Sequence, residues 1–358
     1  MSNDQIAAVT ADFLSRLPSS PDVYPQGIDL IHQAMLLVQF DAAAYRAASF
    51  LDDRILTPKV RGVWIPIARV AAAARAVQNM RPMHFVFHTG HVGSTLVSRL
   101  LDETGAVLPL REPLPLRVLA NAHDALGKPD SLLSEAHFDA LLELFLTLWR
   151  RGYGDSRAVV LKATSSAGRV AGPLLAKRDD ARAICLNLRP EPYLATLLAG
   201  QNSVSDLRGH AAERMRRLIR TLSLERPTPI HALSPGELAA MSWLTETATQ
   251  YDAQQRFAGR VIREDFDAIL ADVAGSMARI ATHFGLTADD RYLSTVARSP
   301  ALTRYAKAPE HAYTPELRQQ ILSEARRLHS VEIRKGLEWL DSVARINTSA
   351  AAVMQANT

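Results

Sequence analysis

The segment from His84 to Leu101 combines residue types that bind anions. An apolar run over 84–88 is typical of a buried strand, and a turn with two glycines, 89–93 (TGHVG), follows it. The next residues, 94–103, have the pattern of an amphipathic helix. Free N–H groups at the start of a helix attract an anion, and glycines let a phosphate approach the backbone. We therefore expect a phosphate-type binding loop with these members: Gly90, Val92, Gly93, Ser94 and Thr95.

This loop differs from the loop that binds ATP or GTP. That motif requires glycine, four residues and then Gly-Lys-Ser/Thr. In this chain Ser94 follows Gly93 directly, and the loop has no lysine. The basic side chain nearest to it is His91, which is charged only when its imidazole is protonated. If His91 holds an anion, we expect activity to fall as the imidazole loses its proton; a neutral loop histidine is the alternative.

The elements around the loop alternate between helix and strand as far as residue 266. Helical patterns separate the strand at 84–88 from four further apolar runs that are expected to be strands. These runs cover 106–110, 158–162, 183–188 and 259–263. Such alternation predicts an α/β fold: a P-loop-type parallel β-sheet of about five strands flanked by helices.

The flanking regions are expected to be helical. High Ala and Leu content predicts helices over 28–40 and 70–80, so residues 1–80 are interpreted as an N-terminal helical segment. Residues 81–300 form the predicted α/β core. Residues 301–358 are expected to hold a closing loop, a C-terminal helix and a frayed tail.

The composition excludes several classes of protein. The chain has 358 residues, 47% apolar and 22% charged, with a net charge of +4 and no block of Lys or Arg, so we expect no nucleic-acid partner. No apolar stretch is long enough to cross a membrane, and the first residues lack the pattern of a secretory signal, so a cytoplasmic protein is expected. The single cysteine, Cys185, is expected to pack in a strand.

A metal site is not expected. His84, His88 and His91 lie close in sequence, but His84 and His88 would point to one face of a strand about 13 Å apart, too far to share one ion. One cysteine cannot form a Cys-based zinc site.

The loop resembles the 5′-phosphosulfate-binding loop of the sulfotransferase family. That loop is usually read as Arg/Lys-Ser-Gly-Thr/Ser-Thr-Leu-Leu, and residues 91–97 (HVGSTLV) occupy the pattern, with His91 in place of the basic residue. Four further segments resemble family motifs in the correct order: 110–113 (LREP), 159–162 (VVLK), 183–196, and a strand end with its following helix at 261–266 and 277–286. The resemblance covers about 81–315, and its motif order is similar to that of tyrosylprotein sulfotransferases and related bacterial enzymes.

The resemblance implies an activity and two catalytic residues. The activity is transfer of a sulfuryl group from 3′-phosphoadenosine 5′-phosphosulfate (PAPS) to a hydroxyl or amine of a small-molecule or peptide acceptor, without a metal. Glu112 stands where these enzymes have the catalytic base, and Lys162 where a lysine contacts the sulfuryl end of the donor. From the residues alone, a surface carboxylate paired with Arg111 or Arg117 is the preferred interpretation of Glu112, and only the resemblance reverses it. For Lys162, a strand end that reaches solvent is an equal alternative.

The resemblance also implies a site for the 3′-phosphate of the donor. The family segment reads Arg-Asp/Asn-Pro, with a serine eight residues after the arginine. Here Arg189 directly precedes Pro190, and Thr196 lies seven residues after Arg189. Alignment on Pro190 puts Thr196 on the serine and Leu188 on the arginine, so Arg189 is expected to serve through a shift of one residue.

A late polar loop, 298–315, is expected to take part as well. Similar loops in the family close over the 3′-phosphate, and Arg304 and Lys307 are the basic residues that would do so here. An ordinary solvent-facing loop is the alternative. Two other functions stay open: a kinase-like P-loop nucleotide enzyme, and a catalytically degenerate binding protein with the sulfotransferase fold.

Overall fold

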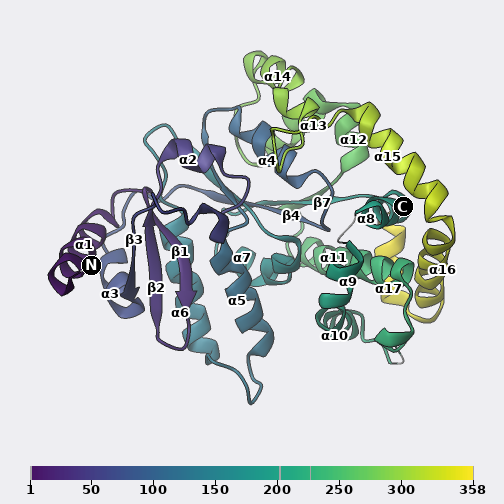
Figure 1. Ribbon diagram of the computed structural model, residues 1–358, viewed down its shortest axis with the longest axis horizontal. Helices are drawn as coiled ribbons and strands as arrows, with labels where there is room; N and C mark the ends of the chain where they lie inside the picture. Colours follow the sequence, from purple (N-terminus) through teal and green to yellow (C-terminus); the bar gives the residue numbers. More distant parts are fainter. Residues whose placement is uncertain (1, 201–202, 226, 358) are drawn as a thin grey trace. The chain divides into compact units, whose positions relative to one another are not determined.

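The computed structural model describes residues 2–200, 203–225 and 227–357. Its main sheet is parallel and five-stranded, in the order β5-β6-β4-β7-β8, with helices on its flanks (Figure 1). The strands are β4 (Met83–His88), β5 (Val107–Arg111), β6 (Ala158–Lys162), β7 (Ala183–Asn187) and β8 (Val261–Asp265). The predicted fold class is therefore confirmed, and β6 has the bounds expected from the sequence.

The chain divides into two compact units whose segments alternate along the sequence. The first unit comprises Met1–Val86, Thr95–Ala183 and Met277–Ser299, and the second comprises Phe87–Ser94, Ile184–Ser276 and Pro300–Thr358. The predicted three-part division, with boundaries after residues 80 and 300, stays a prediction.

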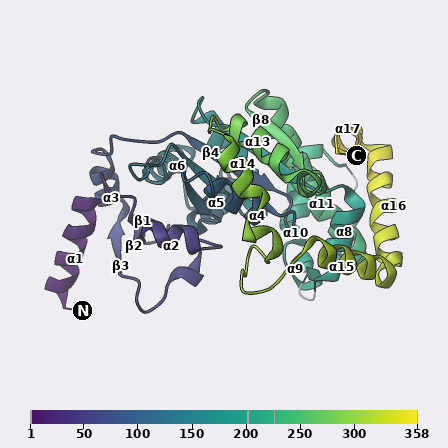
Figure 2. The same ribbon diagram turned by 90° about the horizontal axis from the view of Figure 1, so that it is seen from above.

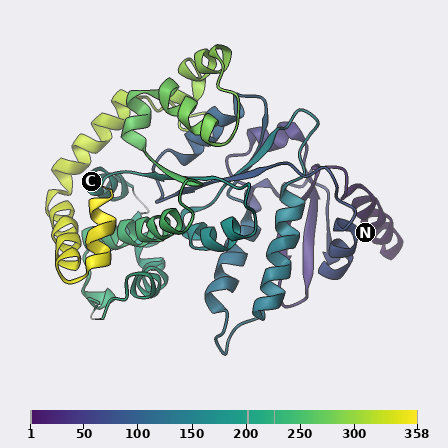
Figure 3. The same cartoon turned by 180° about the vertical axis from the view of Figure 1, so that it is seen from behind.

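The first unit contains a second, antiparallel sheet that packs beside two helices. Its strands are β1 (Val23–Asp29), β2 (Ala34–Gln39) and β3 (Gly62–Pro66). The sheet lies next to α5 (Leu114–Ala125) and α6 (Glu135–Trp149), as Figures 1 and 3 both show. The other α-helices that lie wholly in this unit are α1 (Asn3–Arg16), α2 (Ala42–Ala47), α3 (Ile67–Ala74), α7 (Ala171–Ala176) and α14 (Asp290–Ala297).

The second unit is built around one long buried helix, α11 (Pro235–Arg256). It is capped by Ser234 and Glu237 in a capping box. Its Trp243 is fully buried and donates a hydrogen bond of 2.9 Å to the carbonyl of Leu188. The helices packed on α11 include α16 (Ser330–Ile346) and α17 (Thr348–Gln355), which lie together in Figure 2. The remaining α-helices that lie wholly in this unit are α8 (Pro190–Ala199), α9 (Ser203–Gly209), α10 (Ala211–Leu222), α12 (Phe266–Ala271) and α15 (Pro315–Leu328). Two helices have residues in both units: α4 (Ser94–Asp102) and α13 (Val273–His283).

The prediction of a helix over 28–40 is wrong. These residues form the end of β1, a turn and β2, and the turn is closed by Gln33 in the left-handed conformation (φ 51°). A short apolar run fits a strand as well as a helix, and here pairing of β2 with strands on both sides decides between them. The other predicted helix, 70–80, is confirmed only in its first part, because α3 ends at Ala74.

The prediction of a frayed C-terminal tail is wrong for the residues that the structure describes. Asn347 caps α17 by accepting a hydrogen bond of 2.8 Å from the backbone N–H of Ala350. The Asn347 amide also donates to the carbonyl of Leu222 at 2.8 Å, and Val353 is 1% exposed. These contacts fix the tail in the second unit; Thr358 lies outside the described residues.

Candidate active site

The loop after β4 has the backbone geometry of a tight anion-binding turn. Gly90, His91 and Gly93 all have positive φ, at 95°, 55° and 68°, and α4 starts at the next residue, Ser94. The turn is fixed near its start, since the N–H of Gly90 donates to Nδ1 of His88 at 3.0 Å. His91 is exposed and holds a conformation that non-glycine residues seldom adopt. Such strain is concentrated at functional sites.

Two features require glycine at position 93: its positive φ and the close approach of a neighbouring side chain. A Cβ at this position would lie 1.9 Å from Cε2 of Phe266, the first residue of α12. Only glycine therefore fits between the start of α4 and this aromatic ring.

The Gly93→Ala variant should be less stable than a matched control. Gly105→Ala shares the positive φ (67° against 68°) but meets no atom within 4 Å. We expect a loss of about 1–2 kcal/mol in G105A from the backbone alone and a further ~1–3 kcal/mol in G93A from the clash. Denaturant unfolding of both variants checks this; equal losses would contradict the account of Gly93.

Two threonines at the ends of the loop have hydroxyl groups that nothing in the described protein satisfies. Thr89 and Thr95 are each 2% exposed, and the Oγ1 atom of each is buried without a hydrogen-bond partner among the described residues. Buried polar groups are normally paired, so each unpaired one needs an explanation. Hydroxyl donors at a helix N-terminus suit a phosphate or sulfate group.

Glu112 and Lys162 form a buried ion pair in the first unit. Strands β5 and β6 are parallel neighbours, Arg111 is beside Lys162, and so the strands end side by side. The Lys162 side chain is fully buried and its Nζ donates to Oε1 of Glu112, which is 10% exposed. The sheet hydrogen bonding continues through Glu112, whose N–H donates to the carbonyl of Lys162 at 2.7 Å. Like His91, Glu112 has a left-handed backbone, with φ 54°.

The Arg111 side chain is used on other partners, and Lys162 is buried rather than solvent-facing. Arg111 is 1% exposed and points away from Glu112; it donates to Oγ of Ser98, to Oδ2 of Asp102 and to three backbone carbonyls. Burial lowers the pKa of Arg111 to about 10. Arg111 is the last residue of β5, whereas Glu112 follows the strand with a left-handed backbone, so strand alternation does not relate the two side chains.

Phe50 and Arg54 lie close to the Glu112–Lys162 pair. The Phe50 ring centroid is 5.8 Å from Nζ of Lys162 and 3.5 Å from Cζ of Arg54. Arg54 is held on its other side by Asp52, with 2.8 Å between its Nε and Oδ1 of that carboxylate. The sequence did not predict either residue as part of the site. No sequence motif indicates that the loop containing them packs against the end of a strand.

Arg189 lines a pocket in the second unit. It is exposed, directly precedes α8, and borders a pocket of about 380 Å³ that also contains Asn187 and Arg263. Nη1 of Arg263 is buried without a hydrogen-bond partner among the described residues. Arg263 belongs to the segment 261–266 that resembles a family motif. The sequence did not predict it as a site residue, because an arginine in a strand is common.

The other residues expected at the 3′-phosphate have separate positions. Thr196 lies within α8, and its hydroxyl donates to the carbonyl of Pro192 at 2.7 Å. Arg304 and Lys307 lie in a narrow hairpin, in which Arg304 pairs with Ala312. Thr196, Arg304 and Lys307 are not among the described residues that line the Arg189 pocket. Their contact with a phosphate stays a prediction.

The histidines of β4 have structural roles. His84 stacks on Phe284, with ring centroids 4.9 Å apart and planes at 4°, and burial lowers its pKa to about 4. His88 accepts the hydrogen bond from Gly90 described above. Cys185 is fully buried in β7, and burial raises the pKa of its thiol to about 12. It therefore packs as an inert side chain.

Several solved structures that resemble this chain are sulfotransferases, the family that the sequence motifs resemble. The sulfotransferase domain from the curacin biosynthetic pathway is 12% identical, with 74% of this chain and 99% of that chain covered and a TM-score of 0.39. A sulfotransferase from Mycobacterium avium is 14% identical, with 91% and 96% covered and a TM-score of 0.38. A mouse sulfotransferase complexed with PAP is 11% identical, with 75% and 93% covered and a TM-score of 0.33.

No protein-family model matches the sequence, and no curated protein matches it. Because the TM-scores are below 0.5, the case for a function rests on the residues of this chain. Within the described ranges, no helix is long and apolar enough to cross a membrane.

Proposed function

We propose that the protein is a PAPS-dependent sulfotransferase that transfers a sulfuryl group to a hydroxyl or amine acceptor, with Glu112 as the general base. The observation that carries this proposal is the buried Glu112–Lys162 pair at the ends of two parallel strands. A carboxylate held next to a buried ammonium, on a strained backbone, is costly for the fold and is typical of a functional site. Ligands bind to parallel sheets at this end of the strands.

The loop supports binding of the donor. Its positive-φ turn, the start of α4 and the unsatisfied hydroxyl groups suit the 5′-phosphosulfate. Arg189 and Arg263 suit the 3′-phosphate, since both border one pocket and arginine binds phosphate through two parallel hydrogen bonds. Sulfuryl transfer requires positioning and charge stabilisation rather than a metal, because the transferred group carries less charge than a phosphoryl group.

In the proposed reaction Glu112 accepts the proton of the acceptor hydroxyl. The acceptor oxygen forms a bond to sulfur, the bond between sulfur and the bridging oxygen breaks, and 3′-phosphoadenosine 5′-phosphate (PAP) leaves with the electron pair. Once protonated, Glu112 no longer balances the charge of Lys162. The Lys162 ammonium then stabilises the negative charge that develops on the bridging oxygen.

A transfer assay tests this function. The protein is incubated with PAPS and a panel of phenols, alcohols and amines, in EDTA, and release of PAP is measured. The proposal predicts acceptor-dependent release without added metal. A protein that instead consumes ATP, and only with Mg²⁺, would be the kinase-like enzyme. If the protein binds PAP with one molecule per chain but forms no PAP from PAPS with any class of acceptor, the degenerate binding protein is favoured.

His91 should make donor binding depend on pH. We expect wild-type affinity for PAP to fall between about pH 6 and pH 8.5, because the imidazole loses the charge that holds the anion. His91→Arg should remove this dependence, and His91→Asn, which tolerates the left-handed backbone, should show weak binding at both pH values. Calorimetric titration checks this; the same pH profile in wild type and H91R would contradict a role for His91.

A further inference from the structure

The pocket beside Arg189 contains a buried hydrogen-bond acceptor that the protein does not use. The pocket lies where β7 and β8 end, which is the end of parallel strands at which ligands bind. Its volume of about 380 Å³ is far larger than the ~30 Å³ that a water molecule occupies. Asn187, the last residue of β7, borders it and is 5% exposed, and its Oδ1 is buried without a hydrogen-bond partner among the described residues.

The orientation of the Asn187 amide is fixed by the C-terminal segment. The carbonyl of Val353, in α17, can only accept, so Asn357 turns its amide nitrogen toward it, and Nδ2 donates at 2.6 Å. Oδ1 of Asn357 then faces Asn187, which donates to it from Nδ2 at 3.1 Å. Because this chain of amides uses the nitrogen of Asn187, the oxygen is the atom that remains for the pocket.

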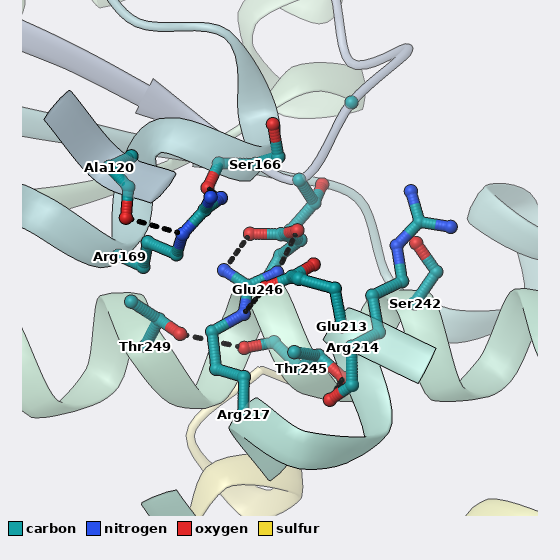
Figure 4. A network of polar contacts seen from close by, with 12 residues as sticks. Ala120, Ser166, Arg169, Glu213, Arg214, Arg217, Ser242, Thr245, Glu246 and Thr249 are labelled. Carbon is teal, nitrogen blue, oxygen red and sulfur yellow. Dashed lines mark hydrogen bonds and ion pairs between the residues drawn. The ribbon is translucent and has the colours of Figure 1, made fainter. Parts of the chain in front are cut away.

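Elsewhere in this unit a buried acceptor has its partner within the protein. Figure 4 shows Glu246 of α11, which is 2% exposed and accepts hydrogen bonds of 2.9 and 2.6 Å from Arg217. Asn187 differs in two respects: its oxygen is unpaired, and it borders a pocket. Buried polar groups are normally paired, so this acceptor indicates a ligand that donates a hydrogen bond to it.

The other groups of the pocket narrow the chemistry of that ligand. The guanidinium groups of Arg189 and Arg263 suit an anion, and Nη1 of Arg263 is buried without a partner in the described part of the chain. A phosphate alone does not satisfy Asn187, because its oxygens and the amide oxygen are both acceptors. A ligand that satisfies all three residues carries both an anionic group and an N–H donor. A 3′-phosphorylated adenosine has both on one ribose, the 3′-phosphate and the amino group of adenine.

We propose that Asn187 selects the base of the donor by accepting a hydrogen bond from the amino group of adenine, with Asn357 fixing its orientation. The inference rests on the proposed function and names the group through which the donor's base is recognised. Asparagine is well suited to this amino group, which it also contacts in the reading of DNA. Hypoxanthine has a carbonyl oxygen in place of the amino group, so it would place two acceptors against each other.

Titration of the full-length protein with two nucleotides tests this. PAP is compared with its deaminated analogue, 3′-phosphoinosine 5′-phosphate. Wild type should bind PAP about 10- to 100-fold more tightly than the analogue. In Asn187→Ala the dissociation constant for PAP should rise by about 10-fold, while that for the analogue stays within about three-fold.

Two further variants support the comparison. Asn121→Ala is the control: it removes an exposed asparagine of α5, in the first unit, and should leave both constants within about two-fold. Asn357→Ala removes only the partner that orients Asn187, so the preference for PAP should fall by a smaller factor. It carries the test if N187A does not fold.

The ratio of the two constants separates base recognition from a general effect on the fold. A merely structural role of Asn187 would weaken both nucleotides by the same factor and would overturn the inference. Equal binding of both nucleotides by wild type would overturn it as well, while the proposed function would stand. A wild-type protein that binds neither nucleotide would overturn the proposed function itself.

Discussion

Replacing Glu112 with glutamine should lower the rate of sulfuryl transfer by at least about 100-fold while PAP affinity changes little. The amide keeps the shape of the side chain but cannot accept the proton of the acceptor, and general-base catalysis contributes about 10²- to 10⁴-fold. Donor binding is assigned to other residues, so it should survive. Single-turnover transfer and calorimetric titration of the same sample measure the two quantities.

The acceptor provides the control for Glu112. An acidic phenol such as 4-nitrophenol needs less help to lose its proton than an aliphatic alcohol, so the ratio of wild-type to E112Q rates should shrink for the phenol. A merely structural role for Glu112 would lower both rates by the same factor. Unchanged transfer in folded E112Q would show that the base is another group.

Replacing Lys162 with methionine should reduce both stability and transfer. Lys162 is fully buried, and its loss leaves the Glu112 carboxylate without its partner, which costs about 3–5 kcal/mol of the free energy of unfolding. Protonation of Glu112 removes the uncompensated charge, so the loss should be smaller at low pH than at neutral pH. Denaturant unfolding at both pH values measures it.

The double variant Glu112→Gln/Lys162→Met separates the two effects of Lys162. With both charges removed, much of the stability should return, because a buried pair is often replaceable by neutral groups. Transfer should stay low, since both the base and the cation at the leaving oxygen are missing. Recovery of transfer together with stability would contradict a catalytic role for the pair.

The sequence predicted the parts of the site that local patterns encode. The loop, the strand β6 and the positions of Glu112 and Lys162 at strand ends follow from apolar runs, glycines and motif order. The sequence did not predict that Lys162 is the partner of Glu112, because this contact depends on β5 and β6 being neighbours in the sheet. Arg111, one of the two partners considered from the sequence, instead joins α4 to the segment after α2.

The residues that were missed come from contacts between distant segments. Arg263 looks like an ordinary charged residue of a strand, and only the fold shows that it borders the same pocket as Arg189. The antiparallel sheet was missed for a related reason. The sequence pattern over 34–39 does not distinguish a helix from a strand. Pairing with β1 and β3 makes these residues a strand.

The most direct test of the central claim is a comparison of two nucleotides by calorimetry, PAP in EDTA and ATP with Mg²⁺. A sulfotransferase site should bind PAP tightly without metal, since the loop lacks the lysine that ATP-binding loops require. We expect saturable binding of PAP with one site per chain and no comparable signal from ATP. Tight binding of Mg²⁺-ATP with no response to PAP would contradict the account.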